Sequence, residues 1–397
     1  MTSLRAGVKL GDPLTRHDTM SRLLRFLSVA ALAATATPAF AQDGAIVYRL
    51  GKDTVAVERW ARTPTRFSGE MVTRSGAAVV RTSYDLTIAG GRVTAATIKR
   101  MQPDGKPVAA GPTEVRLTLG ADSATRTIVT GDSSQTRAFR VANAFPSLPV
   151  FVYAPYVLLA EMGAGKRDSV PAIALAGNNV GYLGLEQMAA DTLRLRGAPY
   201  AMLLTFRGGR IQSQDGSYTT NKSIGTVVPA ATVNVAAIAG AMKPTGVLSP
   251  RMTAYAGFAQ GPITVNYGSP AVRGRTVWGG TLIPFDTVWR TGANEATHLA
   301  TSKTMLLGDM TLAPGLYTLW IQHTRSGTWL IVNKQVGQWG TAYNAANDIG
   351  RVAMTLAKAP DHVEDFTITV RALGGPRGAL EFAWGDQMAA APFTIRP

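Results

Sequence analysis

Residues 84–91 read YDLTIAGG, and this stretch holds the pattern that decides the fold. Three apolar residues alternate with two polar ones, which is typical of a strand with one buried face, and the two glycines at the end favour a tight turn. The alternation returns between residues 45 and 216, with further glycine-containing turns between the runs. Its clearest repeats are Val55/Val57, Val115/Leu117/Leu119 and Leu193/Leu195. This part of the chain is therefore predicted to be an antiparallel β-meander.

An apolar run from Val141 to Leu159 interrupts the meander. Because Pro146, Pro149 and Pro155 would break a membrane-spanning helix, we expect a buried loop and a short helix after Pro155. A meander wrapped on such a helix suggests an open half-barrel that holds an apolar or amphipathic ligand. A plain β-sandwich filled by its own side chains fits the same pattern equally well.

A second helix is predicted shortly before residue 243, where apolar residues recur at helical spacing from Val235 to Met242. The sequence KPTG at residues 243–246 ends this helix, and we place a domain boundary there. The predicted division is an N-terminal domain of residues 42–243, a linker of residues 244–250 and a C-terminal domain of residues 251–397.

The C-terminal domain is predicted to be a β-sandwich. Its clean alternations are Ile263/Val265/Tyr267, Phe366/Ile368/Val370 and Leu380/Phe382/Trp384. Residues 329–332, WLIV, are apolar on both faces, which is typical of a central strand. The predicted fold class is thus all-β and mainly antiparallel in both domains.

Residues 1–41 carry the pattern of a secretory signal peptide. Two arginines precede a short apolar stretch at residues 26–36, and residues 39–41, AFA, fit the site cut by signal peptidase. We expect translation to start at Met20. The mature protein is expected to be soluble, without a transmembrane segment, and periplasmic or extracellular.

The composition excludes cysteine chemistry and bears on which binding partners the protein can have. The chain has no cysteine, so disulfides, a thiolate nucleophile and a lipid anchor on cysteine are excluded. The formal net charge is +15, and five Lys or Arg against two Asp or Glu fall in residues 1–41, which leaves +12 for the remainder. Many arginines alternate with apolar residues, so they are expected on the solvent face of strands. No basic run with interleaved aromatic residues occurs, and we expect no nucleic-acid partner. The sequence indicates no oligomeric state.

The densest group of polar residues lies in residues 274–298, GRTVWGGTLIPFDTVWRTGANEATH. With VNYGSPAVRGRTVWGG from residue 265, LAPGLYTLW from residue 312 and VNKQVGQWG from residue 332, it resembles the bacterial exported domain of unknown function 2911. The resemblance covers the chain from about Ser249 to the C-terminus. It implies a compact exported β domain and no established activity. Residues 42–245 resemble no family that we recognise.

Seven residues of the C-terminal domain are candidates for a ligand site. Arginine and asparagine side chains offer donors and a glutamate offers an acceptor to a hydroxyl-rich ligand such as a saccharide, while tryptophans beside glycines in predicted loops can stack on its rings. The candidates are Arg275, Trp278, Arg290, Thr291, Asn294, Glu295 and Trp339. The alternative is that Arg290 pairs with Glu295, or Arg275 with Asp286, only to pin a long loop.

A hydrolase is the alternative to non-catalytic binding, with the paired carboxylates of Asp286 and Glu295 as acid and base. Glu295 and His298 have the spacing of two metal ligands on one helical face, but the sequence after residue 41 has only three histidines, and we expect no metal. It has no Walker loop or dinucleotide-binding fingerprint, so no cofactor is expected. The preferred prediction is an exported, non-catalytic protein that binds a saccharide or an amphipathic ligand of the envelope.

Overall fold

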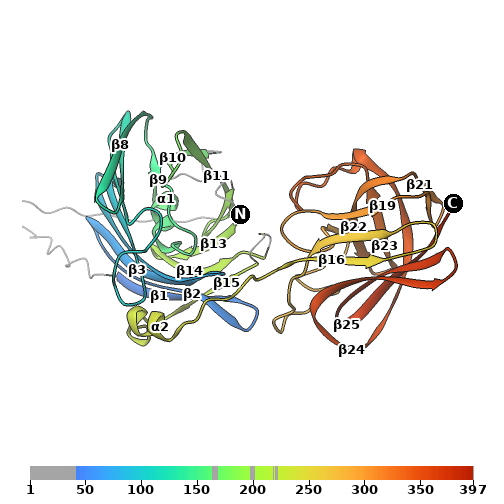
Figure 1. The fold of residues 1–397 in the computed structure, drawn as a ribbon. Coiled ribbons are helices and arrows are strands. Elements are labelled where there is room, and N and C mark those ends of the chain that lie inside the picture. The colour runs from blue at the N-terminus through green and yellow to red at the C-terminus, as the bar shows by residue number, and fades with distance from the viewer. Residues whose placement is uncertain (1–41, 163–168, 197–201, 218, 220–221, 397) are drawn as a thin grey trace, which may run out of the picture. The chain divides into compact units, whose positions relative to one another are not determined.

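The computed structural model describes residues 42–162, 169–196, 202–217, 219 and 222–396. The predicted signal peptide, residues 1–41, lies outside the described residues. The described residues form two sheets, in which every pair of named strands is antiparallel except one (Figure 1). The predicted all-β, mainly antiparallel fold class is confirmed.

The first sheet has fifteen strands. They are β1 (Gln42–Leu50), β2 (Asp53–Thr63), β3 (Arg66–Arg74), β4 (Val79–Ala89), β5 (Arg92–Met101), β6 (Glu114–Leu119), β7 (Ser123–Thr130), β8 (Ser133–Arg140), β9 (Phe145–Pro146), β10 (Ser169–Ile173), β11 (Val180–Ala189), β12 (Thr192–Arg196), β13 (Met202–Arg207), β14 (Arg210–Asp215) and β15 (Ile224–Val228). Strands β1 to β8 pair in sequence order, β9 to β15 do the same, and β1 joins the two runs by pairing with β15. This is the predicted meander.

The stretch YDLTIAGG forms the end of β4 and the turn that follows it. Tyr84, Leu86 and Ile88 are at most 7% exposed, as their alternation predicts. Gly90 and Gly91 have φ angles of 55° and 72° and join β4 to β5, and a two-residue hairpin turn with both φ angles positive suits glycine.

The concave face of the first sheet packs on the chain's own residues. Figure 1 shows the sheet curving round the short helix α1 (Val157–Glu161), which follows the 3₁₀ turn η1 (Ala154–Tyr156). Pro155 lies in the first turn, as predicted. The interior residues Val152, Tyr156 and Leu159 are at most 2% exposed and belong to the same apolar core as the strands. The sheet is thus an open half-barrel in shape, and its own segment fills it.

A buried carboxylate holds this segment in place. Glu58 in β2 is fully buried and accepts hydrogen bonds from the hydroxyls of Tyr48 and Tyr84, each at 2.7 Å. The backbone N–H groups of Tyr153 and Ala154 donate to its Oε2 at 3.1 and 3.3 Å. Burial raises the pKa of Glu58, whereas these hydrogen bonds act to lower it. All four donors would lose their acceptor without this side chain.

The second helix lies on the other face of the first sheet. α2 (Val235–Ala241) follows the 3₁₀ turn η3 (Ala230–Thr232), and the side chain of Asn234 caps it by accepting from the N–H of Ala237. Its apolar residues pack with Val57 and Val72 in a separate small core. Residues 244–250, the predicted linker, contain no helix or strand, while the two-domain division itself stays a prediction.

The second sheet has ten strands. They are β16 (Arg251–Ala256), β17 (Ile263–Gly268), β18 (Thr287–Trp289), β19 (Thr297–Thr301), β20 (Met305–Leu307), β21 (Met310–Leu312), β22 (Gly315–Thr324), β23 (Gly327–Asn333), β24 (Asp348–Gly374) and β25 (Arg377–Ile395), with one 3₁₀ turn, η4 (Ala345–Asn347). The predicted central strand at residues 329–332 is part of β23, which lies between β22 and β24.

The second sheet folds over on itself into two layers. β24 pairs with β23 up to Met354 and with β25 from Thr355 onward, so one long strand passes from the first layer to the second (Figure 1). Leu299 and Leu319 of one layer and Phe382 of the other are fully buried in a single apolar core. This is the packing expected of the predicted sandwich.

None of the helices in the described ranges is long and apolar enough to cross a membrane.

Replacing Glu58 by Ala should lower the free energy of unfolding by about 3–5 kcal/mol, because two hydroxyls and two backbone N–H groups would remain buried without an acceptor. Urea denaturation followed by circular dichroism measures this change. Glu114→Ala is the control, since Glu114 contacts only Arg116 and Lys99 near solvent and should change stability by less than about 1 kcal/mol. Equal effects of the two substitutions would contradict the role given to Glu58.

Candidate functional site

The sequence RTGANEA, residues 290–296, forms a loop on the edge of β22. Trp289 at the end of β18 pairs with Ile321, and Thr297 at the start of β19 pairs with Leu319. Both short strands therefore pair with the same edge of β22. The seven residues between them leave the sheet beside a single residue of β22, Trp320. We call residues 290–296 the RTGANEA loop.

The backbone of the RTGANEA loop is strained. Thr291 and Asn294 have φ angles of 51° and 62°, in the left-handed region that non-glycine residues seldom occupy. Such positions cost about 1–3 kcal/mol each and persist only where the surroundings fix them. Here the Thr297 hydroxyl donates to the carbonyl of Thr291 at 2.6 Å, and Thr291 is fully buried. The loop is held in one conformation rather than left free.

Residues 337–340 run antiparallel beside the RTGANEA loop and fix its other side. The N–H of Gly340 donates to the carbonyl of Asn294 at 2.9 Å, and the N–H of Ala296 donates to the carbonyl of Gln338 at 3.1 Å. The N–H of Gly337 donates to Nε2 of His298 at 3.1 Å. Two motifs that lie about forty residues apart in the sequence, RTGANEAT and VGQWG, thus form one structure.

Arg251 holds the loop to the sheet. Its Nη1 donates to the carbonyl of Glu295 at 3.2 Å, and its Nη2 donates to the carbonyl of Ala296 at 2.9 Å. Its Nε donates to the side chain of Asn266 in β17. Reasoning from the sequence missed this role, because an arginine at the start of a strand is ordinarily a solvent-exposed residue.

Glu295 and Trp339 are brought together as exposed neighbours. They form an antiparallel bridge, and the Cβ atoms of directly opposed residues are about 4.5–5.5 Å apart. Glu295 is exposed and Trp339 is 46% exposed, which is high for a tryptophan. Asn294 lies next to them, and its amide donates to the carbonyl of Ser249 at 3.5 Å. A carboxylate and an indole ring are therefore both open to solvent at this point.

Arg290 and Trp320 lie at the base of the loop. Nε of Arg290 donates to the carbonyl of Gly292 at 3.3 Å, whereas its Nη1 is buried with no hydrogen-bond partner among the described residues. Trp320 is 2% exposed, and its Nε1 is likewise unpartnered within the described part of the chain. Burial lowers the pKa of Arg290. The sequence did not single out Trp320, since it lies in a strand pattern like any core residue.

The ion pairs that were the alternative explanation do not form. Within the described ranges no ion pair joins Arg290 to Glu295 or Arg275 to Asp286, so that expectation is wrong. The guanidinium of Arg275 instead donates to the carbonyls of Ala271 and Val272 at 2.7 and 2.9 Å. Backbone carbonyls satisfy this arginine, and the carboxylates of Asp286 and Glu295 stay open.

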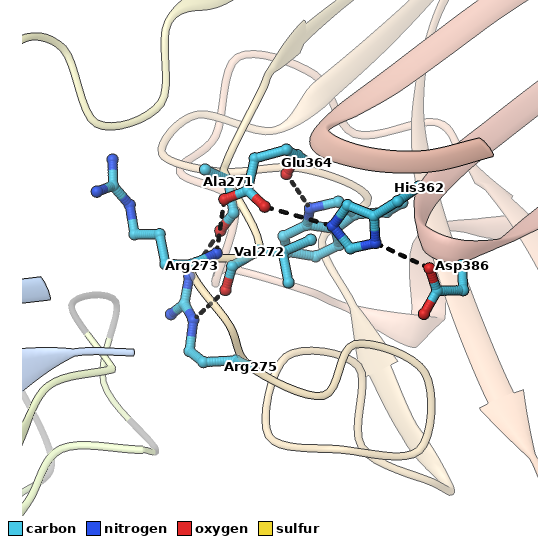
Figure 2. A network of polar contacts seen from close by, with 8 residues as sticks. Ala271, Val272, Arg273, Arg275, His362, Glu364 and Asp386 are labelled. Carbon is cyan, nitrogen blue, oxygen red and sulfur yellow. Dashed lines mark hydrogen bonds and ion pairs between the residues drawn. The ribbon is translucent and has the colours of Figure 1, made fainter. Parts of the chain in front are cut away.

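Arg275 makes its contacts in a second polar cluster, shown in Figure 2, and Trp278 follows it by three residues in the chain. Nε1 of Trp278 donates to the carbonyl of Trp384 at 3.0 Å, and its ring packs edge-on against His323. Trp384 is buried in the core. Trp278 thus anchors its loop to the sandwich and is less open than the sequence suggested.

His362 lies between two carboxylates in the same cluster (Figure 2). Its Nδ1 is 2.8 Å from Oδ1 of Asp386, and its Nε2 is 3.4 Å from Oε2 of Glu364. The N–H of Arg273 donates to the other oxygen of Glu364 at 2.9 Å. Hydrogen bonds that the ring donates to Asp386 and then to Glu364 raise the pKa of His362. Both ring nitrogens are engaged, which fits a charged imidazolium that pins two segments together.

No hydrogen bond or ion pair in the described residues joins the side chains proposed for hydrolysis or for metal binding. Asp286 is exposed, lies three residues before Trp289 in the chain, about 10 Å along an extended strand, and shares no hydrogen bond with Glu295 in the residues described. His298 is turned to Gly337 and Arg251, and burial and then Arg251 lower its pKa. Throughout the described ranges no group of three or more His, Asp or Glu side chains could hold a metal ion. The acid–base pair stays a prediction without support from these contacts.

Gly340→Ala should displace the RTGANEA loop, because a Cβ there would lie 2.6 Å from the carbonyl oxygen of Asn294 and 2.9 Å from Cδ of Arg290. The expected result is faster hydrogen exchange of residues 290–298 and a loss of stability of about 1–3 kcal/mol. Gly315→Ala is the control, since its Cβ would meet nothing closer than 3.5 Å. Unchanged exchange in Gly340→Ala would show that residues 337–340 do not fix the loop.

The histidines should titrate in opposite directions from the usual value. NMR titration should place the pKa of His362 above 6.5 and the pKa values of His298 and His323 below it. Because the folded-state pKa of His362 is raised, its contacts add stability below the unfolded-state pKa, and this contribution is lost as pH rises through the folded-state pKa. Asp386→Asn should lower the pKa of His362. A value that stays the same would remove Asp386 as the main cause.

Comparison with known proteins finds a matching family for the C-terminal part of the chain. The chain matches no curated protein and no solved structure. The region before residue 249 matches no family model. The resemblance noted in the sequence is confirmed, and it covers the RTGANEA loop, residues 337–340 and the second cluster. Residues 249–393 match the model of a family described only as protein of unknown function (DUF2911).

Proposed function

We propose that the protein is an exported, non-catalytic binding protein for a saccharide ligand, which it holds at the RTGANEA loop and residues 337–340. The single observation that carries this proposal is the bridge between Glu295 and Trp339, which sets an exposed carboxylate beside an exposed indole ring. An indole ring stacks on the apolar face of a sugar, and a carboxylate accepts hydrogen bonds from its hydroxyls.

The rigidity of the loop supports binding. A site that is already in its binding conformation loses less entropy when the ligand arrives, so each contact adds more to the affinity. Thr291 and Asn294 have positive φ angles, so the loop conformation costs folding stability. Backbone strain of this kind is concentrated at functional sites.

We favour binding over hydrolysis because no contact in the described residues brings the two candidate carboxylates together. In the described part of the chain, the carboxylates of Asp286 and Glu295 share no partner and no hydrogen bond. Export rests on the leader pattern at residues 1–41, which lies outside the described residues. A protein delivered to the envelope would meet saccharide polymers there.

In the described residues, the concave face of the first sheet is filled and not open to an amphipathic ligand. Its concave face packs on residues 145–161, and Glu58 fixes that segment from within. We therefore assign the ligand to the second sheet.

Trp339→Ala and Glu295→Gln should each weaken binding at least about tenfold, because a stacking face or a hydrogen-bond acceptor is lost. A thermal-shift screen of the mature protein against cell-wall oligosaccharides finds the ligand, since binding stabilises the folded state by mass action. Calorimetry on the variants then gives the affinities.

Tyr255→Ala is the matched control, because Tyr255 is an aromatic residue of β16 with 65% exposure. Its loss should leave the affinity unchanged. Wild-type affinity in both site variants would contradict the proposed site, and turnover of a glycoside abolished by Glu295→Gln would replace binding with hydrolysis.

A further inference from the structure

His298 stands on the outer face of the second sheet, beside residues 335–338. It lies in β19 next to Leu299, whose side chain belongs to the apolar core, so the imidazole points to the opposite face. The residue opposite it in β22 is Thr318, which is fully buried and donates its hydroxyl to the carbonyl of Gln335 at 2.6 Å. The segment is therefore held across this face of the sheet.

The His298 ring has a hydrogen-bond donor at each of its two nitrogens. The N–H of Gly337 lies 3.1 Å from Nε2, and Nη2 of Arg251 lies 3.4 Å from Nδ1. A neutral imidazole has a single acceptor nitrogen, and the shorter contact assigns that role to Nε2. A protonated imidazole carries a hydrogen on both nitrogens and accepts nothing. Protonation therefore removes the partner of Gly337 and sets two positive charges against each other.

The groups around the ring oppose its protonation. Arg251 of β16 is the charged side chain in contact with it, and Glu295 of the RTGANEA loop attracts this arginine. The residues opposite His298 in β17 and β22 are the neutral Asn266 and Thr318. Burial and then Arg251 lower the pKa of His298 from its usual value of 6.5. Among the described residues, no carboxylate forms an ion pair with the ring.

The hydrogen bond from Gly337 begins the pairing that forms the saccharide site. Two residues further on, Trp339 bridges to Glu295, and the N–H of Gly340 donates to the carbonyl of Asn294. Losing the first contact leaves the N–H of Gly337 without its acceptor and loosens this end of the pairing. The position of Trp339 opposite Glu295 thus depends on a neutral imidazole.

We propose that His298 makes the saccharide site sensitive to pH. The site is assembled while the imidazole is neutral and loosens when the ring is protonated, so the ligand is held near neutral pH and released in acid. Because the folded-state pKa of His298 is lowered, its stabilising effect is complete above the unfolded-state pKa and is lost as pH falls through the folded-state pKa. This inference rests on the proposed function, and it adds a regulation of the same site.

NMR on the unliganded mature protein tests the contact between His298 and Gly337 without any ligand. The ¹⁵N–¹H resonance of Gly337 should move with the midpoint of the His298 ring titration. Hydrogen exchange of residues 337–340, corrected for the intrinsic rate at each pH, should quicken below that midpoint. A Gly337 resonance that does not follow His298, or a ring that stays neutral down to about pH 4.5, would overturn the proposal.

A neutral saccharide tests the effect on binding, since its own charge does not change with pH. The probe is a tetrasaccharide of N-acetylglucosamine, and calorimetry gives its affinity across the titration of His298. The affinity should fall about tenfold when the pH is one unit below the pKa of His298, where about one ring in eleven is neutral.

His298→Gln separates the ring from the other groups that titrate. The glutamine Oε1 can accept from Gly337 and takes up no proton, so the affinity should lose this dependence on pH. The carboxylates of the site are the same in both proteins, so the difference between the two pH profiles belongs to His298. His362→Gln is the matched control and should keep the wild-type profile, because His362 contacts Asp386 and Glu364 in the second cluster. Thermal melting checks the fold of each variant.

The binding results separate this inference from the proposed function. An affinity that is the same on both sides of the His298 titration overturns the inference and leaves the saccharide site in place. A fall of the same size in His298→Gln also overturns it, because another group then carries the pH dependence. A Gly337 resonance that follows His298, in a protein that binds no saccharide of the thermal-shift screen at any pH, supports the pH-sensitive contact and contradicts the proposed function.

Discussion

The backbone pairing between residues 294–298 and residues 337–340 is the interaction on which the candidate site depends. It supplies hydrogen-bond partners for backbone groups of the RTGANEA loop, which no longer pair with β22, and for the His298 ring. It also holds Asn294, which has a left-handed backbone conformation, through the hydrogen bond from Gly340 to its carbonyl. Without it, Glu295 and Trp339 would not be opposite each other, and Gly340 would not lie against Arg290. Every contact assigned to the ligand follows from this pairing.

The buried polar atoms of Glu58 and Arg290 differ in how fully they are paired. In the first sheet Glu58 is surrounded by four donors, so its burial fixes an internal segment and leaves nothing for a partner. In the second sheet Nη1 of Arg290 and Nε1 of Trp320 are buried without acceptors among the described residues. A fully paired buried group such as Glu58 adds rigidity, whereas each unpaired donor costs folding stability.

The sequence predicted the elements better than the site. Alternation at YDLTIAGG identified a strand and its turn, since burial of one sheet face repeats every second residue. The pattern does not show which polar residue is buried, and nothing in the sequence distinguishes Glu58 from the other carboxylates. Of the candidate ligand residues, Arg290, Thr291, Asn294, Glu295 and Trp339 meet in one structure. Trp320 was missed, and the two alternative ion pairs do not form. Both outcomes depend on the residue of β22 beside which the RTGANEA loop leaves the sheet. The local sequence does not determine this strand register.

The central claim is that the pairing of residues 294–298 with residues 337–340 fixes the candidate saccharide site. It is tested most directly by the ¹⁵N–¹H resonance of the Trp339 indole, assigned through Trp339→Ala, during titration with a cell-wall oligosaccharide. This resonance should shift in the wild type and stay in place in Gly340→Ala at the same ligand concentration, because the added Cβ displaces the RTGANEA loop. A Trp339 resonance that responds equally in both proteins would contradict the account.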